Sequence, residues 1–294
     1  MAIGNLMTLL HENLFSQLKD QGVVVLPDLI KSEQLSAMRN AFECQLQQPS
    51  FNAWQGYHQT DRRRLMLDQL LTVEQGFVDV ALLSLLQVLV KRYLGESACL
   101  QEAKGWQSFP FKDNFHPLHR DEWYCRNHYY EQKKPMSLKL GLYLDDVDTG
   151  AFAYIPGSHW NVGGDHGTVD ELSTLITGKA GTMFLFDPEG LHQQSFPNLK
   201  KRNAAFFHFF SSDIVLSQNF IRWGRFRQLL IESSYLHSCS PEQLAFLGIG
   251  RQPSTHPIEI QHFRWARYSI NGLVRGINEG QYWFQRVQAR LRRR

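Results

Sequence analysis

The sequence predicts a mostly β fold, an antiparallel barrel or jelly roll with flanking helices. Leucine occupies every second position of the segment 138–144, a period of two that is typical of a strand with one buried face. The segments 181–186 and 204–210 are short runs rich in aromatic residues, which also favours strands. Turns containing Gly, Pro and Asp separate such runs, as expected for a sheet that closes on itself and holds a site in its mouth.

Ahead of the strand-rich region, the sequence predicts two helices around one short strand. Leu10, Leu14 and Leu18 recur every four residues, which is a helical spacing. The segment 23–26 is a continuous apolar run typical of a buried strand. A second helix is expected to begin near Ser32, because apolar residues follow it at helical spacing. We assign these elements a packing role only.

The segment 51–64 is polar and aromatic without a period, so we expect a loop. Its Trp54, Tyr57 and three consecutive arginines could line a substrate entrance, but a solvated charged run is the commoner explanation. We therefore assign them no role. The pattern over 65–94 is helical, and Gly95 is expected to end that helix.

The C-terminal region is predicted to be helical again, over 221–234 and from Pro241, with Ser240 as the cap of the second helix. With 294 residues and 43% hydrophobic content, the chain is long enough for one large domain with helical additions. We expect a single domain over 1–294, divided into an N-terminal flank (1–95), a jelly-roll core (96–212) and a C-terminal helical extension with a basic tail (213–294).

The cysteines and the N-terminus favour the cytoplasm. The four cysteines are scattered and form no Cys-x-x-Cys pair, so neither a zinc site nor a disulfide framework is indicated. The segment 1–13 lacks the basic start and cleavage site of a signal peptide. The longest apolar run, near 78–90, is too short to span a membrane. We expect a cytoplasmic protein.

The basic charge is concentrated at the C-terminus, where the segment 263–294 contains eight arginines and one acidic residue. Within 281–294, Phe284 and Leu291 fall on one helical face and arginines on another, which predicts a basic amphipathic helix. One interpretation is a surface for an anionic lipid, an acidic carrier protein or a phosphorylated substrate. The favoured one is a terminal helix packed on the barrel with a solvated charged side. Nucleic acid is not predicted, because no binding motif accompanies the charge.

The stretch 115–123 contains the main chemical motif. His119 and Asp121 are two positions apart, so on a strand both side chains point to the same face. An iron(II) centre that also takes a bidentate cosubstrate and dioxygen needs three protein ligands on one face, two histidines and a carboxylate. His192, after an apolar strand and a Pro/Gly turn, is the best candidate for the third. Arg202 would enter the same cavity and grip the distal carboxylate of 2-oxoglutarate.

Other histidines compete with His192. His208 is the main rival, because on a strand it would share a face with Arg202, Ala204 and Phe206 and could point into the barrel. A histidine within a run of phenylalanines is more often a buried structural residue, so His192 is preferred. His116 and His128 lack a matching carboxylate, and His159 is expected to shape a turn. We treat these three as non-ligands.

The motifs resemble those of the phytanoyl-CoA hydroxylase-like (PhyH) family of iron(II)/2-oxoglutarate-dependent oxygenases. The likeness extends from Gly22 to Phe210. It rests on the opening segment 22–30, His119-x-Asp121, the acidic turn before Pro156-Gly157-Ser158-His159, and the distal histidine followed by Asn198 and Arg202. It implies a double-stranded β-helix (jelly-roll, cupin-like) barrel, iron(II) held by His119, Asp121 and His192, 2-oxoglutarate held by Arg202, and O2 as cosubstrate.

The resemblance also implies the chemistry. Oxidative decarboxylation of 2-oxoglutarate to succinate and carbon dioxide accompanies oxidation of the substrate. Asp121 favours oxygen chemistry, because halogenating relatives lack this carboxylate. We predict hydroxylation, or a related oxidation, of a small organic substrate in specialised metabolite biosynthesis. The alternatives are a hydroxylase of an acyl group on coenzyme A, a carrier protein or a lipid, and a catalytically silent jelly-roll binding protein.

One position departs from the family pattern. Gln194 stands two residues after the distal histidine, where Ser or Thr is expected, and Ser195 follows it. Trp123 and Arg126 follow the ligand strand and are our candidates for substrate contacts. The predicted partner is a small-molecule substrate. A weak contact of the basic C-terminal helix with a membrane surface or an acidic carrier protein is a second, additional possibility. The sequence does not indicate the oligomeric state.

Overall fold

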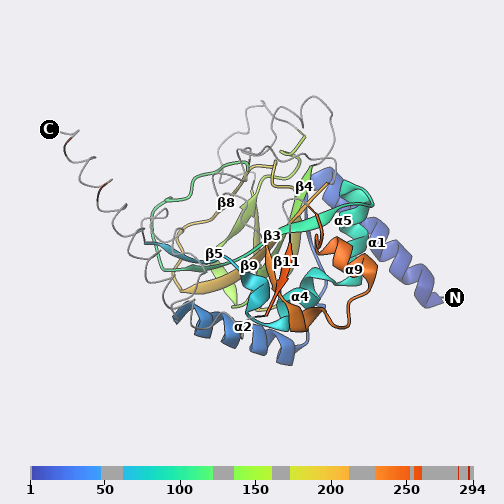
Figure 1. Ribbon diagram of the computed structural model, residues 1–294. Helices are drawn as coiled ribbons and strands as arrows, with labels where there is room; N and C mark the ends of the chain where they lie inside the picture. The colour runs from blue at the N-terminus through green and yellow to red at the C-terminus, as the bar shows by residue number, and fades with distance from the viewer. Residues whose placement is uncertain are drawn as a thin grey trace.

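The computed structural model describes residues 2–47, 62–121, 136–160, 173–211, 229–251 and 255–259, together with Phe284 and Leu291. Within these residues, two antiparallel sheets face each other, and helices cover the outer face of the larger sheet (Figure 1). The predicted jelly roll is therefore confirmed.

The larger sheet has the strand order β1-β7-β4-β9-β3-β2. These strands are β1 (Val23–Val25), β7 (Met183–Phe186), β4 (Ser137–Tyr143), β9 (Arg202–Phe210), β3 (Cys99–Ser108) and β2 (Arg64–Leu67). On β4 the predicted period of two separates the faces. Leu138, Leu140 and Leu142 are fully buried in the core beneath the helices, and the residues between them face the smaller sheet.

The smaller sheet has the order β6-β5-β8, with β6 (Thr174–Gly178), β5 (Val147–Tyr154) and β8 (His192–Gln194). An isolated antiparallel bridge between His119 and His192 lays the segment before Asp121 along the free edge of β8. The two sheets enclose an aromatic cluster in which Phe152 of β5 packs on Phe184 and Phe186 of β7. The aromatic side chains between the two sheets thus lie next to the His192 ring.

The helices of the N-terminal half cover the larger sheet. They are α1 (Ala2–Gln21), α2 (Ser32–Gln47), the 3-10 turn η1 (Leu70–Thr72), α4 (Gln75–Ala81) and α5 (Ser84–Leu94). The ring of Phe42 of α2 packs against Gly105 of β3, where a Cβ atom would overlap it. The predicted strand near Val23 and the predicted helix from Ser32 are confirmed, and Gly95 ends α5 with a positive φ of 105°.

The continuous helical pattern predicted over 65–94 is wrong at its start. Residues 64–67 form β2, whose backbone pairs with β3 in the register Arg64↔Ser108 to Leu67↔Gly105. The remainder is divided into η1, α4 and α5. Backbone hydrogen bonding to β3 at the edge of the larger sheet favours a strand here, and this long-range pairing outweighed the local helical spacing of the leucines.

The C-terminal region contains more than helices. Residues 230–232 form β10 (Leu230–Glu232), which pairs in parallel with β11 (His256–Ile258), and the 3-10 turn η2 (Ser233–Leu236) follows β10. The helix predicted over 221–234 is therefore wrong over 230–232, residues 233–234 begin the 3-10 turn η2, and residues 221–228 lie outside the described residues. The helix α9 (Pro241–Phe246) begins as predicted, with Ser240 and Gln243 forming a capping box.

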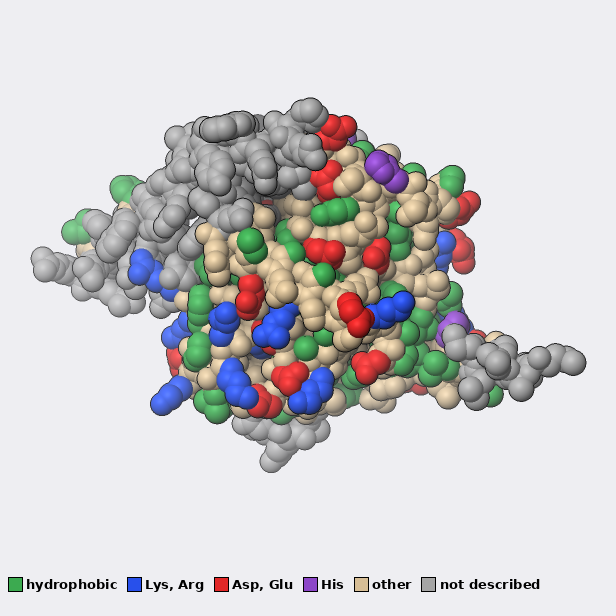
Figure 2. Space-filling model, turned by 90° about the horizontal axis from the view of Figure 1, so that it is seen from below, with side chains coloured by type: hydrophobic (Ala, Val, Ile, Leu, Met, Phe, Trp, Pro, Cys, Tyr) green, Lys and Arg blue, Asp and Glu red, His purple; other side chains and the backbone are tan. Residues whose placement is uncertain are grey.

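The surface seen in Figure 2 carries basic and acidic side chains interspersed with one another. Two exposed ion pairs of the protein surface, Lys200–Asp148 and Lys179–Asp146, bring opposite charges into direct contact. No helix among the described residues is long and apolar enough to cross a membrane. Most of the basic segment 281–294 lies outside the described residues; Phe284 and Leu291 are helical and more than half exposed.

Candidate metal centre

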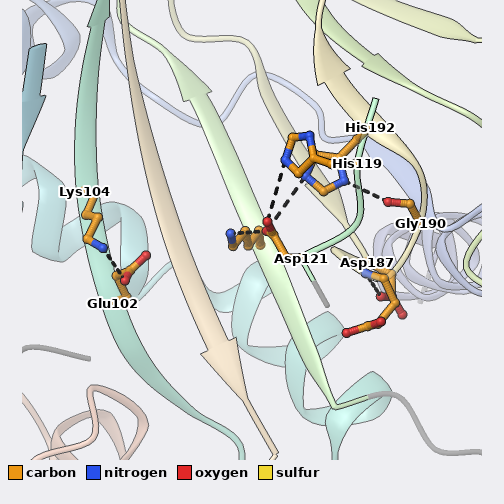
Figure 3. A network of polar contacts seen from close by, with 9 residues as sticks. Glu102, Lys104, His119, Asp121, Asp187, Gly190 and His192 are labelled. Carbon is orange, nitrogen blue, oxygen red and sulfur yellow. Dashed lines mark hydrogen bonds and ion pairs between the residues drawn. The ribbon is translucent and has the colours of Figure 1, made fainter. Parts of the chain in front are cut away.

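Three side chains from two chain segments converge at one end of the barrel. His119 and Asp121 come from the segment beside β8, and His192 is the first residue of β8. Their ligand atoms all lie within 4.8 Å of one another. The Nε2 atom of His119 is 3.7 Å from Oδ1 of Asp121, and that of His192 is 3.8 Å from Oδ2. Figure 3 shows the carboxylate pointing between the two imidazoles.

The backbone fixes this arrangement. His119 and His192 donate their N–H groups to each other's carbonyl oxygens, at 3.0 and 2.9 Å. The N–H of Asp121 donates to the carbonyl of Pro188 at 2.9 Å, in the turn that leads into β8. Because each ligand is hydrogen-bonded to the other segment, the three side chains are placed by sheet pairing rather than by flexible loops.

Each imidazole is oriented by a backbone carbonyl. Nδ1 of His119 donates to the carbonyl of Pro117 at 2.9 Å, and Nδ1 of His192 donates to that of Gly190 at 2.8 Å. A carbonyl can only accept, so the hydrogen of each neutral ring lies on Nδ1. Nε2 then presents a lone pair toward Asp121, which is the form that binds a metal ion.

Burial and charge act on the two buried ligands in opposite directions. Burial alone would raise the pKa of Asp121, but the Lys139 ammonium and the rings of His192 and His119 outweigh it and hold that pKa below its usual range. Burial lowers the pKa of His192 to about 3, against the opposing effect of the Asp121 carboxylate. At neutral pH the site therefore contains an anionic carboxylate beside a neutral distal imidazole.

Aromatic rings surround the distal histidine. The centroid of the His192 ring lies 5.3 Å from that of Phe186 and 5.6 Å from that of Phe152. Tyr154 stacks on the same ring at 6.4 Å, and its hydroxyl donates to the carbonyl of Asp187. This packing keeps water from the barrel side of His192 and leaves the side that faces Asp121 and His119 for a ligand.

Two arginines lie beyond His192 on the inner face of the larger sheet. The register places Arg64 of β2, Ser108 of β3 and Arg202 of β9 in one row across adjacent strands. Both guanidinium groups are buried. Nε and Nη1 of Arg202 have no hydrogen-bond partner, and the guanidinium lies 5.5 Å from the ring centroid of Tyr143. A buried donor without an acceptor is costly, so this geometry fits an anionic ligand that supplies one.

Gln194 takes the place where the resemblance implies Ser or Thr. It lies two residues after His192 on β8, hence on the same face of the strand. Its Oε1 atom accepts from Nε of Arg64 at 3.0 Å and also from Nη2 of that residue, and Ser108 Oγ donates to it at 3.2 Å. The departure at Gln194 therefore positions a second arginine instead of supplying a hydroxyl to the first.

The remaining predicted residues have different positions. His208 of β9 is buried beside Lys139 in the sheet register and is not among the three clustered ligands. His159 contacts the backbone of α1 through the Lys19 carbonyl, in agreement with a structural role. The His116 ring packs edge-on against His119 with centroids 4.3 Å apart. Trp123, Arg126 and His128 lie outside the described residues.

Sequence reasoning missed two residues of this site, Arg64 and Lys139. Burial lowers the pKa of Arg64 to about 9, and the charge of Arg202 adds to that effect; the guanidinium is still protonated at neutral pH. Lys139 donates to Oδ2 of Asp121. A signal for Lys139 was present, because it occupies a non-leucine position of β4 and must face the barrel interior. Arg64 offered no such signal within its run of arginines.

The donor set fits a divalent iron ion. Two neutral imidazoles and one carboxylate on one side of the site leave the opposite positions open, which is the facial arrangement used by non-haem iron(II) oxygenases. The two buried Arg202 nitrogen atoms without partners fit a carboxylate-bearing cosubstrate nearby. His119, Asp121 and His192 would hold the metal.

Comparison with solved structures identifies the same fold in two enzymes. The non-haem α-ketoglutarate-dependent epimerase SnoN from nogalamycin biosynthesis superposes with a TM-score of 0.53 at 12% identity, covering 70% of this chain and 84% of SnoN. The non-haem α-ketoglutarate-dependent carbocyclase SnoK from the same biosynthesis gives 0.54 at 15% identity, covering 74% and 90%. No curated protein sequence matches the chain.

The model of one protein family, phytanoyl-CoA dioxygenase (PhyH), matches residues 18–202. This range is more than half of the chain, contains all three clustered ligands and ends at Arg202. The predicted resemblance is thereby confirmed: the chain belongs to the phytanoyl-CoA dioxygenase family of non-haem iron(II)- and 2-oxoglutarate-dependent enzymes.

Proposed function

We propose that this protein hydroxylates, or otherwise oxidises, a small organic substrate with iron(II), 2-oxoglutarate and dioxygen. The observation that carries the proposal is the juxtaposition of the ligand triad with the two buried arginines. The triad fits iron(II), and the open donors of Arg202 fit the far carboxylate of a dicarboxylic acid that also reaches the metal.

The spacing supports this pairing of metal and cosubstrate. His192 and Gln194 are two residues apart on one strand face, which is roughly 7 Å. Gln194 holds Arg64 directly, and Arg64 and Arg202 lie in one row with Ser108 between them. A five-carbon diacid whose 2-oxo acid end faces the triad therefore places its other carboxylate at the guanidinium groups.

The residues of the chain have separable roles in this proposal. Iron(II) with 2-oxoglutarate and dioxygen supplies the oxidising chemistry, with succinate and carbon dioxide as coproducts. His119, Asp121 and His192 bind the metal, and Arg202 and Arg64 bind and orient the diacid. The aromatic cluster of Phe152, Phe184 and Phe186 excludes water from the barrel side of the site.

The substrate is proposed to be a small molecule of specialised metabolism. The two similar structures are an epimerase and a carbocyclase of one biosynthetic pathway, which supports a small-molecule substrate for a fold of this kind. Those two enzymes are named for an epimerisation and a ring closure, so a fold of this kind is compatible with reactions other than hydroxylation.

The decisive experiment is anaerobic addition of iron(II) and 2-oxoglutarate to the metal-free protein, followed by visible absorption spectroscopy. We expect the weak charge-transfer band of an iron-chelated 2-oxo acid. The band should vanish in His119→Ala and in Arg202→Ala. The matched controls are His237→Ala and Arg92→Ala, which remove an exposed histidine and an exposed arginine of the described surface.

The outcomes separate the candidate functions. Iron binding without the band would reject the cosubstrate assignment and favour a catalytically silent binding protein. If the band survives in Arg202→Ala but is lost in Arg64→Met, then Arg64 rather than Arg202 makes the principal contact with the carboxylate of 2-oxoglutarate. Uncoupled turnover of 2-oxoglutarate to succinate without added substrate would independently support the enzymatic assignment.

A further inference from the structure

Lys139 lies on the inner face of β4, at the floor of the metal centre. The sheet register places it between His208 of β9 and Phe186 of β7. Its side chain is only 15% exposed and that of Asp121 only 8% exposed. The ammonium group donates a hydrogen bond to Oδ2 of Asp121.

This contact offsets the buried charge of Asp121. The two imidazoles direct their N–H groups to the carbonyls of Pro117 and Gly190, so their Nε2 atoms carry lone pairs and cannot donate to the carboxylate. The distances of 3.7 and 3.8 Å from Nε2 to the carboxylate oxygens agree with this. Among the described residues, Lys139 is the cation in contact with Asp121.

A metal ion and Lys139 act on the same carboxylate. An ion held by the triad must take an oxygen of Asp121, and the ammonium then lies within a few ångströms of a second, doubly charged cation in a buried site. The attraction that stabilises the metal-free site becomes a repulsion, or the ammonium must withdraw from Oδ2. In either case metal binding becomes less favourable, so the affinity of the triad for the ion is lower.

We propose that Lys139 is a positioning residue that substitutes for the metal: its ammonium holds Asp121 in place in the metal-free protein and lowers the affinity of the triad for a divalent ion. The inference rests on the metal site of the proposed function but not on the cosubstrate. It predicts a centre that is assembled before the metal arrives and that exchanges metal more readily than its ligand set alone would allow.

The test compares Lys139→Met, which keeps an unbranched side chain one atom shorter and removes the charge, with Lys139→Arg, which keeps the charge. Manganese(II) binding is measured by calorimetry, and thermal unfolding is recorded with and without the ion. We expect Lys139→Met to bind manganese(II) roughly ten-fold more tightly or better, because a buried repulsion is removed. Its midpoint without metal should fall, because Asp121 loses its partner. Lys139→Arg should resemble the wild type in both measurements.

Other results overturn the proposal. Weaker manganese binding by Lys139→Met, with an unchanged metal-free midpoint, would mean that Lys139 supports the metal-bound geometry instead. Equal affinity in all three proteins would mean that the ammonium and the metal do not compete. Absence of manganese(II) binding by the wild type would reject the triad as a metal site. This outcome therefore distinguishes failure of the proposed function from failure of the proposal for Lys139.

A second measurement tests the proposal on the wild type, in case Lys139→Met folds poorly. Reductive methylation of the wild type with 13C-formaldehyde keeps the lysine charge, and the Lys139 signal is identified by its loss in Lys139→Arg. Addition of the diamagnetic ion zinc(II) should shift this signal as the ammonium leaves Asp121. A signal unchanged by saturating zinc(II) contradicts competition.

Discussion

His119 and His192 are joined to each other through their backbones before any metal is considered. Each donates its N–H to the other's carbonyl, at 3.0 and 2.9 Å, and the centroids of their rings are 4.5 Å apart. The two histidines are a directly opposed, hydrogen-bonded antiparallel pair, so their side chains lie on the same face of the paired segments. The geometry of the candidate metal centre is thus a property of strand pairing.

The choice of distal ligand is tested by removing each candidate. His192→Ala should lose stoichiometric iron(II) because its Nε2 atom faces Asp121. His208→Ala should keep one iron per chain, since His208 lies outside the clustered ligands. Metal analysis after anaerobic loading and gel filtration measures both. Loss of iron in His208→Ala alone would reverse the assignment.

The two arginines should contribute unequally to cosubstrate affinity. Arg202→Ala removes the donors that have no partner and should weaken 2-oxoglutarate binding about 100-fold, the effect of losing two charge-assisted hydrogen bonds. Arg64→Met should have a smaller effect, because Arg64 is already engaged by Gln194. Calorimetric titration of the manganese-loaded protein measures both. Arg92→Ala, on the surface, is the control and should bind normally.

Asp187 should make stability depend on pH. Burial raises the pKa of this carboxyl to about 6, although the N–H of Glu189 and the hydroxyl of Tyr93 partly oppose that rise. Between about pH 4 and about pH 6 the folded protein then binds more protons here than the unfolded chain. The contribution is present at low pH and is lost as the pH rises through about 6.

Asp187→Asn removes this dependence. Relative to the wild type, its free energy of unfolding should increase by up to about 3 kcal/mol between pH 4 and pH 7, which is the equivalent of two pKa units. Urea titrations of both proteins across that range measure the difference. A difference that does not change with pH would show that folding does not raise the pKa of the Asp187 carboxyl.

Gly190 should tolerate no side chain. A Cβ atom there would overlap the hydroxyl of Tyr154, and the Gly190 carbonyl orients the His192 ring. Gly190→Ala should therefore lower both stability and metal affinity. Gly157→Ala is the matched control: its nearest atom is 4.0 Å away, and only its positive φ of 75° is strained, at a cost of about 1 kcal/mol. Normal metal affinity in Gly190→Ala would contradict the role of that carbonyl.

The parts of the site that the sequence predicted are those encoded within a few residues. His119 and Asp121 could be identified because alternation along one strand places both on one face. His192 followed from a turn and from the resemblance. Lys139 could have been found in the same way as the leucines beside it, since the alternation that buries Leu138 and Leu140 on one face places Lys139 on the other.

Arg64 could not be predicted by such reasoning. Its burial depends on the pairing of β2 with β3 and on Gln194, which lies far away in the sequence. The same long-range pairing turned the first residues of the predicted helix over 65–94 into a strand. Local spacing describes which face a residue occupies within an element, whereas the choice between helix and strand at a sheet edge depends on the rest of the sheet.

The position of β9 has a consequence for the order of events during synthesis. β3 and β4 are not neighbours in the larger sheet, because β9 lies between them and pairs with both. A nascent chain that has not yet released residue 210 therefore holds His119 and Asp121 but lacks the strand that joins the two halves of the sheet. Such non-local pairings form late. The larger sheet can therefore close only after β9 has been synthesised, although all three clustered side chains precede it in the chain.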